Sequence, residues 1–382
     1  MQQRALPKHP SVSLPILGFG CMRLPIVGRD MNAIDEPKAA SLLESAIEQG
    51  VNYLDTAYPY HGGNSELFVG KFLEERRLRD RVTLATKLPT WLVNTEADVE
   101  RLLDEQLAKL RTPTIDFYMI HGLSAERWEV VQRLNGLATL ERARADGRIR
   151  HIGFSFHGSP DAFVAIADGY DWDFCQIQYN FMDEEYQAGT RGLHHAAARH
   201  IAVFAMEPLR GGSLAVPGPD AVMATWARAA RPRPPAEWAL GWVWNHPEVT
   251  LALSGMNAPE QLAENIAAAK SSHAGAMTAD ELALVGEVRD IFRAKTKVNC
   301  TTCGYCLPCP SGVSIPDVFS AYNTSGMFDA REKAAMVYRF WTVAGGHGAD
   351  QCAQCGECEP KCPQQIPIKD KLEEAHAHLV HQ

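Results

Sequence analysis

Long apolar runs are missing from this sequence. The best candidate for a membrane span, residues 238–253, is interrupted by Asn245, His246, Pro247 and Glu248, and no run reaches the about 18 apolar residues of a transmembrane helix. The opening stretch MQQRALPKHPSVSLP lacks the apolar core of a secretory signal. We therefore expect no membrane partner and a location in the reducing cytosol, that is, a cytoplasmic protein.

An excess of basic residues is also missing. The chain has 37 Lys and Arg against 46 Asp and Glu, a net charge of −9, so nucleic acid is not expected as a partner. Hydrophobic residues make up 46% and charged residues 22%, which excludes global disorder. A length of 382 residues suits two or three domains of about 150 residues, or one barrel of about 250 residues with a smaller companion.

Cysteine is nearly absent from most of the chain. Only Cys21 and Cys175 precede residue 300, and we expect both to be small buried packing residues. The other eight cysteines fall between residues 300 and 362. In a long chain without a secretory signal, cysteines at such density more often hold metal than form disulfides.

The eight clustered cysteines form two runs with the spacing of bacterial iron–sulfur motifs. The first is C-x2-C-x2-C-x2-C-P and the second is C-x2-C-x2-C-x3-C-P. In such runs three thiolates bind one cluster and the fourth reaches the other. Structural zinc, which favours separated CxxC pairs, and free thiols are the alternatives. We predict two 4Fe–4S clusters, one held by Cys300, Cys303, Cys306 and Cys362 and the other by Cys352, Cys355, Cys358 and Cys309.

Strand and helix patterns alternate through the first 290 or so residues, which predicts a parallel sheet. Eight such units fit a closed (β/α)8 TIM barrel of the α/β class. A doubly wound open sheet is the alternative, but its usual early GxGxxG fingerprint is missing. The predicted strands are residues 16–20, 51–55, 82–87, 115–121, 149–155, 174–178, 201–207 and 249–254.

Beyond the predicted barrel, residues 329–341 have apolar residues at helical spacing between the two cysteine runs. A single long helix is expected at 125–146 within the barrel. We therefore predict two domains, a barrel at 1–294 and a smaller α-helical iron–sulfur domain at 295–382.

Three successive predicted strands end in a titratable side chain, namely Asp55, Lys87 and His121, and Tyr60 follows on the loop after the first of them. Such strand ends converge on the active site of a barrel. Lys87 would lower the pKa of the Tyr60 phenol from its usual value near 10, and Asp55 would orient Lys87. Tyr60 would then protonate a carbonyl oxygen beside His121 as hydride reaches the carbon. Taken singly, each residue also fits a structural ion pair or a buried core position.

The motifs around these residues resemble the aldo/keto reductase family. They are DTAYPYHGGNSE at 55–66, ATK ending at Lys87 and FYMIHG ending at residue 122. The family is a (β/α)8 barrel that reduces aldehydes and ketones with NADPH. The resemblance covers about residues 10–290 and implies a catalytic tetrad of Asp55, Tyr60, Lys87 and His121. The stretch CTTCGYCLPCPSGVSIP resembles a branch of the family with a fused α-helical ferredoxin-like domain.

The resemblance also implies where a nicotinamide cofactor binds. Ser155 and Gln176 match residues that hold the carboxamide, and Met206 stands where many members of the family place an aromatic residue under the nicotinamide ring. Gly255 and Gln261 stand where the family usually has basic residues for the 2′-phosphate, so the cofactor is either NADP or NAD. The full set is Gly20, Arg23, Ser155, Gln176, Met206, Arg210, Gly211, Ser254, Gly255, Gln261, Glu264 and Asn265, of which Arg23 and Arg210 are candidates to compensate for the missing basic residues.

We expect an oxidoreductase that moves hydride between NAD(P)H and a small-molecule carbonyl or alcohol. Hydride chemistry at a carbonyl needs no one-electron carrier, so the clusters would be structural or regulatory. One alternative is an electron-transfer enzyme whose clusters exchange electrons with a partner redox protein. Another is a sensor without turnover, in which the barrel binds nucleotide and the clusters report oxygen or iron.

Overall fold

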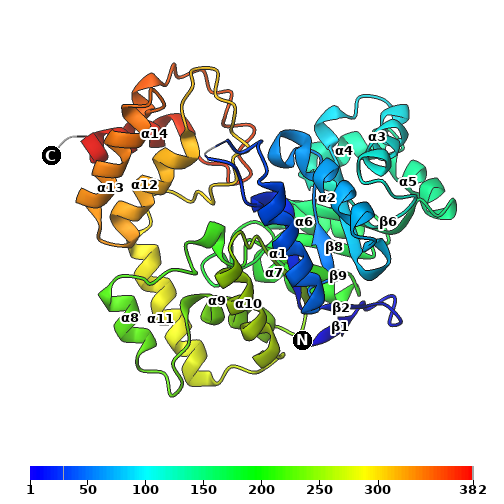
Figure 1. The fold of residues 1–382 in the computed structure, drawn as a ribbon, viewed down its shortest axis with the longest axis horizontal. Coiled ribbons are helices and arrows are strands. Elements are labelled where there is room, and N and C mark those ends of the chain that lie inside the picture. The colour runs from blue at the N-terminus through cyan, green and yellow to red at the C-terminus, as the bar shows by residue number, and fades with distance from the viewer. Residues whose placement is uncertain (29, 381–382) are drawn as a thin grey trace. The chain divides into compact units, whose positions relative to one another are not determined.

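The computed structural model describes residues 1–28 and 30–380 (Figure 1). It divides into two compact units. The barrel unit comprises residues 1–208 and 239–277, and the cysteine-rich unit comprises residues 209–238 and 278–382. The predicted boundary at 294/295 falls at the end of a helix of the second unit, α11 (Ala279–Lys295), and stays a prediction. In the described part of the chain, no helix has the length and hydrophobicity needed to cross a membrane.

Eight parallel strands of the barrel unit close into a barrel. Each strand pairs with the next along the chain, and the last pairs with the first, as Leu253 opposite Gly18 illustrates. This closure confirms the predicted TIM barrel and excludes the open sheet. The strands are β3 (Leu17–Gly20), β4 (Tyr53–Asp55), β5 (Thr83–Leu88), β6 (Ile115–Leu123), β7 (Ile149–Phe156), β8 (Phe174–Gln178), β9 (Ala202–Met206) and β10 (Val249–Ser254).

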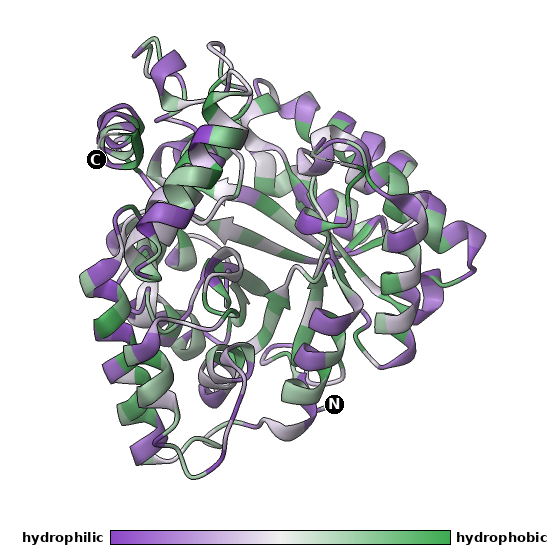
Figure 2. Ribbon diagram, turned by 60° about the vertical axis from the view of Figure 1, so that its left-hand side comes forward, coloured by the Kyte–Doolittle hydropathy of each residue, from purple (hydrophilic) through white to green (hydrophobic). Residues whose placement is uncertain are grey.

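Helices follow the strands and cover the outside of the barrel. Figure 2 shows hydrophobic colour along the strands and hydrophilic colour on the outer faces of many helices. The single helix predicted at 125–146 is instead two helices, because Asn135 between them adopts a left-handed φ of 53°, which asparagine tolerates better than most residues. The helices are α1 (Glu36–Glu48), α2 (Asn64–Glu75), α3 (Glu96–Lys109), α4 (Ala125–Arg133), α5 (Gly136–Ala145), α6 (Pro160–Asp168), α7 (Gly189–Ala198), α9 (Pro235–Asn245) and α10 (Pro259–Ser271).

A hairpin that the sequence analysis did not predict packs against the start of the barrel strands. Its strands β1 (Gln3–Ala5) and β2 (Ser13–Pro15) pair antiparallel. Leu6 and Leu14 are fully buried in one cluster with inward-facing strand residues such as Phe117. The hairpin therefore closes the end of the barrel at which the strands begin, and leaves the opposite end for a site.

The cysteine-rich unit is helical. Besides α11 it contains α8 (Asp220–Trp226), α12 (Ile315–Met327), α13 (Arg331–Val337), which continues as a π-helical segment at Tyr338–Val343, and α14 (Ile368–Val380). Its apolar core joins residues of α12, α13, the π-helical segment and α14, including Val318, Tyr338 and Leu372, and six of the clustered cysteines pack against that core. Most of the clustered cysteines are therefore partly buried against the core of this unit, as a helical iron–sulfur domain requires.

Candidate active site

The structure brings the four residues of the tetrad together at the ends of β4, β5 and β6. Lys87 Nζ donates to Asp55 Oδ1 over 2.6 Å, to the carbonyl oxygen of Thr56 over 2.7 Å and to the hydroxyl of Tyr60 over 3.1 Å. An ammonium has three donors, so these contacts use all of them. All four side chains are at least nine-tenths buried, and the Tyr60 ring meets the ring of His121 edge-on at 6.4 Å.

Burial sets the charge states in the tetrad. It raises the pKa of Asp55, and the Lys87 ammonium at 2.6 Å opposes that rise. The pKa of His121 lies well below its ordinary value, mainly because of burial and then because of the positive charge of Lys87. His121 is therefore a neutral imidazole at pH 7, which can donate one hydrogen bond without being an acid.

A second layer of polar side chains supports Lys87 from behind. Thr86 Oγ1 donates to Glu66 Oε1 over 2.6 Å, and Gln106 Nε2 donates both to Glu66 and to the carbonyl oxygen of Lys87. Tyr118 completes the network by donating to Gln106 Oε1 over 2.7 Å. The sequence analysis missed these residues, although Glu66 lies inside the motif at 55–66 and could have been found there. The network fixes the backbone from which the Lys87 side chain extends.

Two further side chains border His121. The indole of Trp91 is 43% exposed, and its ring centroid lies 5.2 Å from that of His121. Arg127 lies with its guanidinium carbon 5.9 Å from the centroid of the Trp91 ring, and its Nη1 donates to the carbonyl oxygen of Gly122 over 2.9 Å. Arg127 lies outside the motifs found in the sequence, so its position beside Trp91 was not predicted. The Trp91 ring thus borders His121 directly, and Arg127 in turn borders the Trp91 ring.

Several predicted nicotinamide contacts surround the same end of the barrel. Gly20, Ser155, Met206 and Ser254 lie at or near the ends of β3, β7, β9 and β10. Ser155 Oγ accepts from the amide of Gly122 over 2.8 Å. The Oε1 atom of Gln176 is buried and has no hydrogen-bond partner among the described residues. Such an atom fits the amide donor of a carboxamide, so the residues present suit a nicotinamide ring.

The predicted contacts for the outer part of the cofactor already have partners in the barrel unit. Arg23 Nη2 lies 3.1 Å from Glu207 Oε1. Gln261 Oε1 accepts from the amide of Asn257 over 2.9 Å. Asn265 Nδ2 donates to the Ser254 hydroxyl over 2.8 Å, while Gly255 and Glu264 lie close by in sequence, after β10 and on α10.

The other two predicted phosphate contacts belong to the cysteine-rich unit. Arg210 is 4% exposed and donates to Asn299 Oδ1. A Cβ atom at Gly211 would lie 2.5 Å from the carbonyl oxygen of Thr301, and its φ of 67° favours glycine. The loop after β9 therefore packs against the start of the first cysteine run, a contact between segments far apart in sequence.

Four of the eight clustered cysteines line one cavity. They are the four predicted to share a cluster, and the cavity is completed by apolar side chains such as Ile315 and Phe319. Burial, together with the neighbouring Cys303 and Cys362, raises the pKa of the Cys300 thiol to about 12. Because iron binds thiolates, bound iron would supply the positive charge that these crowded thiols need. The lining cysteines are Cys300, Cys303, Cys306 and Cys362.

Three of the remaining four cysteines, Cys309, Cys352 and Cys358, also lie close together. Burial raises the pKa of Cys358, and the neighbouring Cys309 and Cys352 add to that rise. Cys309 comes from the first run and the other two come from the second, as the predicted exchange of the fourth ligand requires. Cys355 is exposed. This second ligand set stays a prediction.

Comparisons with known proteins agree with this architecture. The sequence signature of the aldo/keto reductase family matches residues 16–285, and that of a 4Fe-4S dicluster domain matches residues 299–366. A 6-dehydroglucose reductase from Novosphingobium aromaticivorans is 28% identical over 283 residues, which are 69% of this chain and 88% of that protein.

Solved structures resemble the barrel. The aldo-keto reductase AKR11C1 from Bacillus halodurans, in its holo form, superposes with a TM-score of 0.63 at 24% identity, over 75% of this chain and 96% of that one. An aldo-keto reductase from Klebsiella pneumoniae in complex with NADPH gives a TM-score of 0.59 at 23% identity, over 76% and 96%. These likenesses establish the fold.

Proposed function

The chain belongs to the aldo/keto reductase family and is an NAD(P)-dependent oxidoreductase, and we propose that it transfers a hydride between NAD(P)H and a small carbonyl or alcohol at the tetrad. The observation that carries this proposal is the Lys87 ammonium, which is shared between the Asp55 carboxylate and the Tyr60 hydroxyl. A phenol in that position is a proton donor next to the place where hydride would arrive.

In this proposal the chain's own residues handle the proton and the substrate oxygen. The bound nicotinamide supplies the hydride. Lys87 stabilises the phenolate of Tyr60, so that the phenol proton can move to the substrate oxygen. Asp55 keeps Lys87 charged and oriented. The neutral ring of His121 donates a hydrogen bond to the same oxygen and positions the carbonyl.

We further propose that Ser155 and Gln176 hold the carboxamide and that Met206 packs against the nicotinamide ring, as a polarizable thioether can. Gly255 and Gln261 carry no charge, and Arg23 is already paired with Glu207. These features would weaken the binding of the 2′-phosphate of NADPH, so the enzyme would accept NADH as well as NADPH. The other cofactor contacts in the proposal are Gly20, Arg210, Gly211, Ser254, Glu264 and Asn265.

We also propose that the 4Fe-4S dicluster domain holds two clusters through the two ligand sets given above. The four cysteines around one cavity support the first set, and the neighbours of Cys358 support the second. A reducing cytosol suits this assignment, because the thiols must stay free to bind iron. In the main proposal the clusters stabilise this domain and take no part in the hydride step.

The test is a pair of Tyr→Phe variants assayed against a panel of aldehydes and ketones. Tyr60→Phe is expected to lower kcat/KM by about 100- to 10,000-fold, which is the usual contribution of a general acid. Tyr53→Phe is the matched control, because Tyr53 begins β4, the strand that precedes the Tyr60 loop, and its buried hydroxyl has no hydrogen-bond partner among the described residues. The affinity for NAD(P)H should be the same in the Tyr60→Phe and Tyr53→Phe variants. Full activity of Tyr60→Phe would refute the proposal.

One observation favours a second candidate function, electron exchange with a partner redox protein. Arg210 and Gly211, which we expect at the cofactor phosphates, pack against Asn299 and Thr301 of the first cysteine run. A nucleotide bound by this loop would therefore lie near the first ligand set. In this case substitution of either Tyr60 or a cluster cysteine would abolish turnover, and turnover would need an added electron acceptor.

A further inference from the structure

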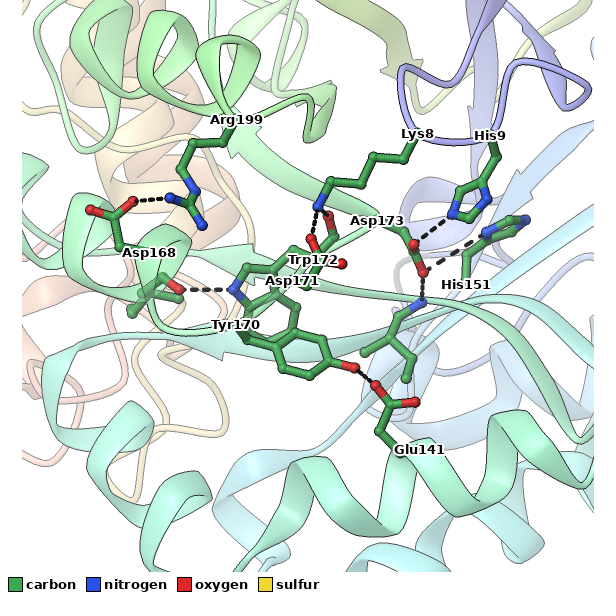
Figure 3. Close-up of polar contacts among 12 residues, drawn as sticks. Lys8, His9, Glu141, His151, Asp168, Tyr170, Asp171, Trp172, Asp173 and Arg199 are labelled. Carbon is green, nitrogen blue, oxygen red and sulfur yellow. Dashed lines mark hydrogen bonds and ion pairs between the residues drawn. The ribbon is translucent and has the colours of Figure 1, made fainter.

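Three potential metal ligands meet at the end of the barrel opposite the tetrad. Figure 3 shows His9, from the loop of the β1–β2 hairpin, beside His151 on β7 and Asp173, which immediately precedes β8. One ligand atom of each residue lies within 4.8 Å of the other two. The three residues thus come from segments that are far apart in sequence and meet where the strands begin.

The geometry of this group leaves one buried nitrogen available. His9 Nε2 lies 2.7 Å from Asp173 Oδ1. His151 is 9% exposed, and its Nδ1 is buried, lies 3.9 Å from Asp173 Oδ2 and has no hydrogen-bond partner among the described residues. The ring centroids of His9 and His151 lie 4.8 Å apart. A buried imidazole nitrogen that faces a carboxylate and a second imidazole either carries the proton itself or binds a cation.

The surroundings hold the carboxylate in a fixed orientation. The amide of Ile152 donates to Asp173 Oδ2 over 2.8 Å, and Arg144 Nη1 lies 3.5 Å from the same oxygen. Oδ1 thereby faces His9. Ligands of metal sites are commonly oriented by a second set of hydrogen bonds of this kind.

We propose that His9, His151 and Asp173 bind one divalent transition-metal ion, with zinc as the best match. Two imidazoles and one carboxylate are a common ligand set for zinc, which needs a fourth ligand such as water to complete a tetrahedron. The bound ion ties the hairpin to β7 and β8. It is a structural site, because these residues lie at the strand starts and the tetrad lies at the strand ends.

The alternative is a His9–Asp173 hydrogen bond that needs no ion, and a zinc titration separates the two. The titration uses the full-length protein with its clusters loaded, under anaerobic conditions, so that iron already occupies the cysteines. We expect calorimetry to find one zinc site per chain, which His151→Gln weakens by at least about 100-fold, since even the loss of a residue that only orients a ligand costs about 10- to 100-fold in metal affinity. His195→Gln is the matched control, because that histidine pairs with Asp168 on the surface over 2.9 Å.

A second variant and a second readout keep the test decisive. His9 lies on a partly exposed loop, so His9→Gln is expected to fold and to lose the rise in melting temperature that zinc gives the wild type. X-ray absorption at the zinc edge should show nitrogen and oxygen at about 2.0–2.2 Å, with unchanged iron content. Sulfur ligands at about 2.3 Å, or equal zinc affinity in the wild type and both variants, would overturn the proposal.

Discussion

The tetrad and the cysteines are positioned by different forces. In the barrel unit, protein groups alone place the reactive atoms, since Lys87 makes three hydrogen bonds and Glu66 and Gln106 support it from behind. In the cysteine-rich unit, burial raises the pKa of thiols such as Cys300 and Cys362. Thiolates are therefore unfavourable there until a cation arrives. The comparison teaches that the first site is complete on folding, whereas the second is complete only with iron.

The apolar cores of the two units support the same conclusion. The strand-lined core of the barrel includes fully buried aromatic side chains, for example Tyr53, Phe174 and Phe204. In the cysteine-rich unit, cysteines that are only partly buried pack against the core residues. A bound cluster would cover that surface and link the helices, so metal binding and folding should be coupled in this unit.

The largest expected effect is the loss of a cluster ligand. Cys362→Ala removes one of four thiols at the first cavity, so iron should fall from about eight atoms per chain to about four or fewer. Amides of α12 and α14 should lose their protection against hydrogen exchange, while those of the barrel strands keep it. Cys175→Ala is the control, because Cys175 is fully buried in β8 of the barrel unit and belongs to neither cysteine run. An unchanged iron content in Cys362→Ala would contradict the claim that Cys362 is a ligand of the first cluster.

An intermediate effect is expected from Lys87→Met. This change leaves the buried Asp55 carboxylate without its cation and should lower the free energy of unfolding by about 3–5 kcal/mol. Lys71→Met breaks an exposed pair with Glu36, and its effect on stability should be much smaller, because solvent screens exposed ion pairs. Urea unfolding, followed by circular dichroism, measures both. Equal losses would mean that the tetrad is not held by a buried ion pair.

The smallest expected effect is a dependence of stability on pH. Burial lowers the pKa of His121 well below the value of about 6.5 of an unfolded chain, so the unfolded state binds more protons as the pH falls below 6.5. This contribution to stability is complete above pH 6.5 and should shrink by about 2 kcal/mol by pH 5. His121→Asn should remove that part of the dependence, whereas the exposed His200→Asn should not. The same slope in all three proteins would contradict this charge state.

The sequence was sufficient for the parts of the molecule that local patterns encode. Alternation of strands and helices predicted the barrel, and the family signature and the closed sheet confirm it. The motifs around Asp55 and Lys87 predicted a group of residues that the structure brings together. The spacing of the cysteines predicted an iron–sulfur domain, which the match at residues 299–366 confirms.

What the sequence did not reveal depends on contacts between distant segments. The hairpin that carries His9 folds onto strands more than a hundred residues away, and the packing of Gly211 against Thr301 joins two segments that share no motif. Arg127 reaches its place beside Trp91 from the first turn of α4, where its sequence neighbours are ordinary helix formers. The helix break at Asn135 depends on one backbone angle, which the helical pattern on either side does not encode.

The most direct test of the account is an anaerobic mixing experiment with the cluster-loaded protein. NADPH and, separately, NADH are added, and the oxidation of nicotinamide and the visible absorbance of the clusters are followed together, first without and then with a panel of carbonyl compounds. We predict that nicotinamide is oxidised only when a carbonyl is present and that the cluster absorbance stays constant. Bleaching of the clusters by nucleotide alone would contradict a hydride step confined to the tetrad.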